Sequence, residues 1–133
     1  MPRIPETNMH EALGIEMSES GDGVVTGKLP VVDEVRQPFG LVHGGALLTL
    51  AEALTSFGTW MGVRDNGEIA LGQEINASLL RPITEGHVHG KATVRRRGRT
   101  AWVWEVEITD DQDRLCALIR ATIAVRDAPK TEP

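Results

Sequence analysis

The sequence predicts an α+β domain in which one long helix packs against an antiparallel sheet. Three observations support this prediction: one segment has apolar residues at helical spacing, several later segments alternate with the period of strands, and short turns separate those segments. The chain has 133 residues, of which 41% are hydrophobic and 25% charged, as in one ordinary domain. We expect a single domain over residues 1–133, with a core at about 9–126 and flexible, proline-rich ends.

The first expected elements flank an irregular loop. A strand is predicted from Val24 to Val31, after a turn at Ser20–Gly23. Residues 33–45 contain Pro38 and the glycines at 40, 44 and 45, which predicts a loop. A helix follows, because apolar residues recur at spacings of three and four, at Leu47, Leu50, Leu54, Phe57 and Met61. Its other face also carries apolar residues, so we expect a second subunit to cover Leu48, Ala53 and Trp60.

The rest of the chain predicts four strands joined by hairpin turns. Their alternating apolar residues are Ile69, Leu71, Ile75, Ala77 and Leu79 in the first, Val88, Ala92 and Val94 in the second, Trp102, Trp104, Val106 and Ile108 in the third, and Leu115, Ala117, Ile119, Ala121, Ile123 and Val125 in the fourth. Turns are expected at 97–99 and 110–113, and both are short enough for hairpins.

Composition and charge narrow the classes of function. The net charge of −5 argues against a nucleic-acid binder. Residues 81–100 hold six basic side chains and the single acid Glu85, which fits either a local anionic ligand or a solvated strand face. Cys116 is the only cysteine, and there is neither a signal-peptide pattern nor an apolar segment long enough to span a membrane. We therefore expect a cytoplasmic protein with a buried free thiol and no membrane partner.

The most informative stretch runs from Gln37 to Gly45 and leads into the helix. Two glycines at a helix start let the backbone approach a ligand closely. The first free N–H groups and the positive end of the helix dipole favour an oxygen that gains negative charge. The alternative is that Gly44 and Gly45 only make a tight turn.

Glu52 lies two turns into the predicted helix, away from the apolar stripe. A glutamate on a helix is usually solvated, but Leu48 and Ser56 on the same face offer no cation for a surface ion pair. A carboxylate at a partly dry subunit interface is a candidate nucleophile or general base. His43 is another candidate base, although about 13 Å of helical path separates it from Glu52.

A metal site is not expected. By strand alternation, His87 and His89 share one face with basic neighbours, and no third ligand is evident. The residues predicted on that face with the two histidines are Lys91, Thr93, Arg95 and Arg97.

These motifs resemble the hotdog-fold acyl-CoA thioesterases that use a glutamate, of the 4-hydroxybenzoyl-CoA and phenylacetic-acid type. The resemblance rests on Gln37–Ala46 followed by Leu50–Glu52, and continues through Gly72-Gln73, Arg81-Pro82, Glu85–Val88, Trp104–Val106 and Arg114–Ala117. It implies a long helix wrapped by an antiparallel sheet, active sites at a subunit interface, and a homotetramer built as a dimer of dimers. It implies no separate cofactor, because coenzyme A is part of the substrate.

By position, the resemblance also implies roles for single residues. Glu52 matches the catalytic carboxylate, which either attacks the thioester carbonyl or activates water, and Ser56 matches a residue that positions the water. Gly44 matches the backbone N–H that polarises the carbonyl, while Gln37 and His43 match groups that orient the substrate and this loop. The phosphates of coenzyme A are implied near Arg81, Arg99 and Thr100, and the strand-face argument adds Arg95 and Arg97.

One departure bears on the substrate. The enterobactin and menaquinone thioesterases carry a histidine soon after an Asn-Ala pair, whereas Ser78 and Leu79 follow Asn76-Ala77 here. This favours a simple aromatic acyl-CoA, such as hydroxybenzoyl-CoA or phenylacetyl-CoA, whose ring would suit Phe57, Trp60 and Leu79. Two alternatives stay open: a 3-hydroxyacyl thioester dehydratase, and a non-catalytic acyl-CoA-binding module that would not need Glu52.

Overall fold

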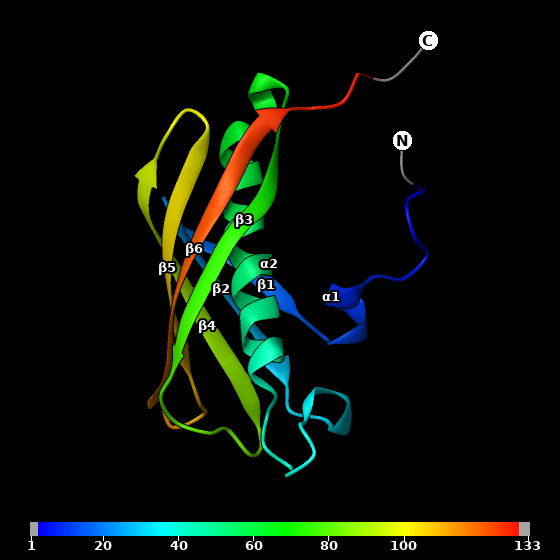
Figure 1. Cartoon of the computed structure of the whole chain (residues 1–133), viewed down its shortest axis with the longest axis vertical. Helices are drawn as coiled ribbons and strands as arrows, with labels where there is room; N and C mark the ends of the chain where they lie inside the picture. The colour runs from blue at the N-terminus through cyan, green and yellow to red at the C-terminus, as the bar shows by residue number, and fades with distance from the viewer. Residues whose placement is uncertain (1–2, 131–133) are drawn as a thin grey trace.

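The computed structural model describes residues 3–130, and its main feature is an antiparallel sheet that curves around one long helix (Figure 1). The helix α2 spans Gly44–Val63, and the strands lie in the order β1-β2-β4-β5-β6-β3. The strands are β1 (Glu16–Gly21), β2 (Val24–Pro30), β3 (Glu68–Leu79), β4 (His87–Arg97), β5 (Ala101–Thr109) and β6 (Leu115–Asp127). This confirms the predicted fold class. The predicted flexible ends include 1–2 and 131–133, which lie outside the described residues.

The segment before α2 differs from the prediction, because β1 and β2 form a hairpin where one strand was expected. In β1 only Met17 is half-buried, and the other residues are exposed. An almost wholly polar strand at the edge of a sheet lacks the apolar alternation by which strands are recognised. The short helix α1 (Met9–Ala12) was missed for the same reason, since none of its residues is buried. Two 3₁₀ turns, η1 (Asp33–Val35) and η2 (Arg64–Asn66), flank α2.

The predicted apolar stripe of α2 faces the sheet. Leu50 and Leu54 are fully buried, and Thr59 accepts a hydrogen bond from Nε1 of Trp104 at 2.9 Å. On the other face, Ala53 is buried within the single chain, whereas Trp60 keeps 40% of its surface exposed. The open part of this face therefore lies around Trp60, and Ala53 needs no second subunit to cover it. In the described part of the chain, no helix combines the length and hydropathy needed to cross a membrane.

A β-bulge in β3 corrects the predicted alternation of this strand. Gly72 pairs with Ile123 and Glu74 pairs with Thr122, so Gln73 is an extra residue without a partner. Residues directly opposite each other on antiparallel strands share a face. Gly72 therefore lies on the helix side with Ile75, whereas Leu71 points outward and is 51% exposed.

A second bulge, at Arg95 in β4, moves Arg97 to the helix side. Val94 pairs with Trp104 and Arg96 with Val103, after which Arg97 lies opposite the buried Trp102. The prediction that Arg97 shares the outer face with His87 and His89 was therefore wrong, because strict alternation fails at a bulge. A similar irregularity at Cys116 places Leu115 on the outer face, where it is 40% exposed. Cys116 itself is a buried free thiol, as predicted.

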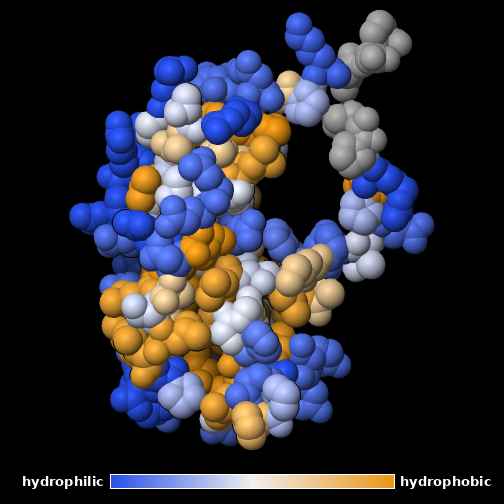
Figure 2. Space-filling view, viewed as in Figure 1, coloured by the Kyte–Doolittle hydropathy of each residue, from blue (hydrophilic) through white to orange (hydrophobic). Residues whose placement is uncertain are grey.

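The free edge of β3 is the most exposed apolar part of the sheet. β3 stands at the end of the strand order and pairs only with β6. Figure 2 shows hydrophobic side chains gathered toward the lower end of the molecule, where β3 ends in Figure 1. Leu79 and Leu80 are 58% and 55% exposed at this end. An unpaired apolar strand edge is a surface that proteins normally cover.

Candidate active site

The start of α2 presents one backbone N–H that has no acceptor. His43 precedes the helix in an extended conformation, and its Nδ1 accepts a hydrogen bond from the N–H of Gly45 at 2.8 Å. The N–H of Ala46 donates to the carbonyl of His43 at 2.9 Å. The N–H of Gly44 donates to no atom of residues 3–130. A free N–H at the positive end of a helix dipole is suited to an oxygen that gains negative charge.

The loop before α2 is held in shape by Gln37. Its backbone N–H donates to the carbonyl of Leu41 at 2.8 Å, and its Oε1 accepts from the N–H groups of Phe39 and Leu41. Gln37 and Gly44 line the same cavity, of about 330 Å³, together with Arg81 and an apolar wall that includes Leu79. Leu79 lies directly over the helix start, since a methyl group on Gly44 would lie 2.8 Å from its Cδ1. The sequence-predicted residues Gln37, His43, Gly44 and Arg81 thus meet at this end of α2.

Glu52 lies farther along α2 and is exposed. No cation of residues 3–130 lies within ion-pair distance of its carboxylate. Ser56, one turn later, is half-buried, and its hydroxyl makes no hydrogen bond with the described residues, whereas Thr55 and Thr59 both donate to helix carbonyls. The carboxylate of Glu52 and the hydroxyl of Ser56 lie on one helix face and have no partner among the described residues, so both can contact a substrate or a water.

The single chain does not bring Glu52 and Gly44 together. They are separated by eight residues of α2, which corresponds to about 12 Å along the helix axis. A reacting carbon must lie about 3 Å from both the nucleophile and the donor of its oxyanion. The sequence indicated the same kind of separation between His43 and Glu52. The groups at the helix start and the group around Glu52 therefore form two separate halves of a site.

The basic residues are also divided. Arg99 and Thr100 lie in the turn between β4 and β5, at the opposite end of the sheet from Arg81 (Figure 1). β4 connects the two ends and is 11 residues long, or about 36 Å. Neither Arg81 nor Arg99 makes an ion pair with the described residues. One chain therefore cannot bring both guanidinium groups to one phosphate.

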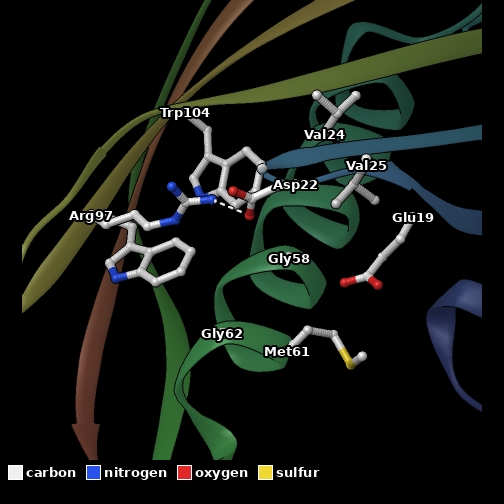
Figure 3. Close-up of a pocket in the computed structure, with 12 residues that line it drawn as sticks. Glu19, Asp22, Val24, Val25, Gly58, Met61, Gly62, Arg97 and Trp104 are labelled. Atoms are coloured by element: carbon white, nitrogen blue, oxygen red, sulfur yellow. Dashed lines mark hydrogen bonds and ion pairs between the residues drawn. The ribbon is translucent and has the colours of Figure 1, made fainter.

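Arg95 and Arg97 contact carboxylates of their own chain. Nε of Arg95 lies 3.9 Å from Oε1 of Glu105. Arg97 donates to Oδ1 of Asp22 at 2.8 Å and stands 5.4 Å above the ring of Trp102. Figure 3 shows Arg97 and Asp22 in a second cavity, of about 570 Å³, beside the C-terminal half of α2. Arg97 was predicted to bind phosphate only because it was expected on the outer face with the other basic residues. Because Arg97 lies on the helix side, this reason no longer holds.

The two strand histidines belong to a hydrogen-bonded surface cluster that the sequence analysis missed. Nε2 of His89 lies 2.7 Å from Oδ1 of Asp111, and the N–H of His87 donates to the same carboxylate. The hydrogen bond with His89 is the main cause that lowers the pKa of Asp111. The neighbouring Asp110 accepts from backbone and side-chain donors of Arg114, which lower its pKa as well. These contacts fasten the turn between β5 and β6.

Gly72 is the residue beside Glu52 that sequence reasoning did not assign. A methyl group at Gly72 would lie 2.6 Å from Oε1 of Glu52, so the carboxylate rests against the backbone of β3. A glycine inside a strand pattern often marks a bulge or a close approach, and that signal was available in the sequence.

Comparison with known proteins identifies the family. The model of the thioesterase superfamily matches residues 39–117, which include the start of α2 and Glu52. The chain belongs to the thioesterase superfamily. The proofreading thioesterase EntH of Cronobacter turicensis is 41% identical over 115 residues, covering 86% of this chain and 83% of that protein.

Solved thioesterases show the same fold. A thioesterase from Haemophilus influenzae matches with a TM-score of 0.88 and 32% identity over 96% of this chain and 89% of its own. A thioesterase from Staphylococcus aureus, solved as a glutamine-to-alanine variant, matches with a TM-score of 0.86 and 32% identity over 90% of this chain and 99% of its own. The protein is thus a thioesterase with the hotdog fold, which favours hydrolysis over the dehydratase and binding-module alternatives.

Proposed function

We propose that this thioesterase hydrolyses an acyl-CoA thioester with an aromatic acyl group, releasing the free acid and coenzyme A. The unbonded N–H of Gly44 is the observation that supports this most directly. It lies at the start of α2 and beside a cavity that also holds Gln37 and Arg81.

The N–H of Gly44 would act on the thioester carbonyl. As a nucleophile adds to the carbonyl carbon, the oxygen gains negative charge, and a donor that is already in place stabilises this charge without reorganisation. A single donor of this kind contributes about 3 kcal/mol to the transition state. His43 keeps the neighbouring N–H of Gly45 engaged and so fixes the helix start, while Gln37 holds the preceding loop.

Glu52 would supply the second half of the reaction by one of two routes. In the first, its carboxylate attacks the carbonyl carbon, the C–S bond breaks to release the thiolate of coenzyme A, and water then hydrolyses the resulting anhydride. In the second, the carboxylate takes a proton from a water that attacks the carbon itself, and the C–S bond then breaks to release the thiolate of coenzyme A, which takes up that proton. Ser56, one turn after Glu52 on the helix, would orient that water. Both routes end in the free acid and the thiol.

Two subunits would complete the site. The distance of about 12 Å between Gly44 and Glu52 in one chain is too great for one carbonyl group. Pairing of the free β3 edges around a two-fold axis would bury the exposed leucines and run the two α2 helices in opposite directions. Gly44 of one subunit would then face Glu52 of the partner subunit. The same pairing sets the Arg81 end of one chain beside the Arg99 end of the other, as the phosphates of coenzyme A require.

The aromatic group would lie along the open face of α2. Trp60 follows Glu52 by eight residues, on the same side of the helix, and is 40% exposed. Phe57 belongs to the stripe that faces the sheet but is only half-buried, and Leu79 stands over the helix start. Rings favour such surfaces because they bury a large apolar area in a defined orientation.

A thiol-release assay tests the proposal. Wild type and Glu52→Ala would be assayed on benzoyl-type, phenylacetyl and straight-chain CoA thioesters. We expect an aryl ester to be cleaved fastest by wild type, and Glu52→Ala to lose about 100-fold or more in turnover. Faster cleavage of straight-chain esters would reject the aromatic assignment, and full activity of Glu52→Ala would remove Glu52 from the mechanism.

A further inference from the structure

The bulge in β3 puts a glycine opposite Glu52. Counted back from Ile75, regular alternation would turn Gln73 toward the helix. The extra residue shifts the alternation, so Gly72 faces the helix instead, and the carboxylate of Glu52 lies where a side chain at Gly72 would begin.

The contact between Gly72 and Glu52 leaves no room for a methyl group. A Cβ at Gly72 would lie 2.6 Å from Oε1, 3.1 Å from Cδ and 3.5 Å from Cγ of Glu52. The backbone of Gly72 does not need glycine for its conformation, because its φ is not positive. The absence of a side chain at Gly72 therefore leaves room for the carboxylate of Glu52.

We propose that Gly72 and the β3 bulge are a positioning device for Glu52, an inference that rests on the proposed role of that carboxylate. The atoms that a methyl group would meet are the end of a flexible, exposed side chain, which rotates away at little cost to folding. Gly72→Ala therefore displaces the carboxylate while leaving the fold intact. A displacement of about 1 Å at a reacting group can cost on the order of 100-fold in rate.

The first test compares two glycines on the helix side of the sheet. We expect Gly72→Ala to lower kcat by about 10- to 100-fold with little change in KM or Tm. Gly90→Ala is the matched control, because a methyl group there would meet the buried side chains of Leu54 at 2.8 Å and Leu50 at 3.3 Å. It should lower Tm and leave kcat unchanged. Wild-type kcat in Gly72→Ala, or a fall in Tm as large as in Gly90→Ala, would overturn the proposal.

The second test asks whether Gly72 acts through Glu52. Glu52→Asp withdraws the carboxylate by one methylene, about 1.5 Å, which removes the closest contact, that of 2.6 Å to Oε1, that a methyl group at Gly72 would make. We expect Gly72→Ala to cost less than threefold in kcat when added to Glu52→Asp, far less than in wild type. Independent, multiplying losses would overturn the proposal. An inactive Glu52→Ala beside a fully active Gly72→Ala rejects only this inference, whereas an active Glu52→Ala rejects the catalytic role of Glu52 on which the inference rests.

Discussion

The charged residues divide into those with partners and those without. Arg97 and Arg114 each donate a short hydrogen bond to an aspartate, whereas Arg81 and Arg99 contact no carboxylate of residues 3–130. Both unpaired guanidinium groups are exposed, so they remain hydrated and open to an anionic ligand. Arginine suits phosphate because its planar group can bond two oxygens at once.

This division predicts a selective effect on substrate binding. Arg81→Ala and Arg99→Ala should each raise KM for an aryl-CoA ester about tenfold, because each removes charge-assisted hydrogen bonds to phosphate. The corresponding pantetheine thioester, which lacks the nucleotide, should keep its KM. Lys28→Ala removes a surface charge that pairs with Glu16 and serves as the control. Equal losses on both esters would reject the phosphate assignment.

Asp110 predicts a pH dependence of stability. Its carboxylate accepts from the N–H groups of Gln112 and Arg114 and from Nε of Arg114, and these bonds lower its pKa below 3.8. The unfolded state therefore binds the proton more readily, so the stabilisation is complete above pH 3.8 and is lost as pH falls through the folded pKa.

Urea unfolding of wild type and Asp110→Asn at several pH values measures this effect. The difference in unfolding free energy between the two proteins should be constant near neutral pH and should shrink below pH 3.8. A difference that stays constant into the acid range would show that the charge of Asp110 contributes nothing.

At the scale of single elements, the N–H of Gly44 at the start of α2 can be removed without destabilising the helix. Gly44 is the first helical residue, a position where proline is tolerated because its N–H has no partner within the helix. His43 has ψ of 133°, the extended conformation that a following proline favours.

Gly44→Pro should therefore remove the proposed oxyanion donor and keep the helix. We expect a loss of kcat of about 100-fold or more, with far-ultraviolet circular dichroism unchanged. Gly44→Ala keeps the N–H and adds the same Cβ near Leu79, so it should stay much more active than Gly44→Pro. Equal activity in both variants would mean that another group binds the carbonyl oxygen.

At the scale of the whole molecule, the separation of the two half-sites predicts complementation. Glu52→Ala and Gly44→Pro chains, each nearly inactive alone, should recover about one quarter of wild-type activity after they are mixed and exchange subunits. Half of the dimers would then be mixed, and each mixed dimer would contain one site with Glu52 and Gly44 both intact. The recovery should be absent when Glu52→Ala is mixed with itself at the same concentration. No recovery after demonstrated exchange would place the whole site within one chain.

Much of this architecture could be predicted from local pattern. The stripe through Leu50 and Leu54 determined α2, and the alternation through Trp102 and Trp104 determined a central strand, because burial of one face imposes the period of each element. The glycines at 44 and 45 marked the helix start, since their motif is contiguous in the chain. The polar strand β1 carried no such period, so its pairing with β2 became visible only in three dimensions.

The sequence by itself determined the fold class, the family and the residues at the helix start, whereas tertiary structure alone decided the faces on which several site residues lie. An extra residue at 73 turns Gly72 toward Glu52, and one at 95 turns Arg97 away from the outer face. A bulge depends on how a neighbouring strand pairs, so the alternation within one strand cannot locate it. The separation of Gly44 from Glu52, by contrast, follows from the rigid rise of a helix and could be predicted once the helix was recognised in the sequence.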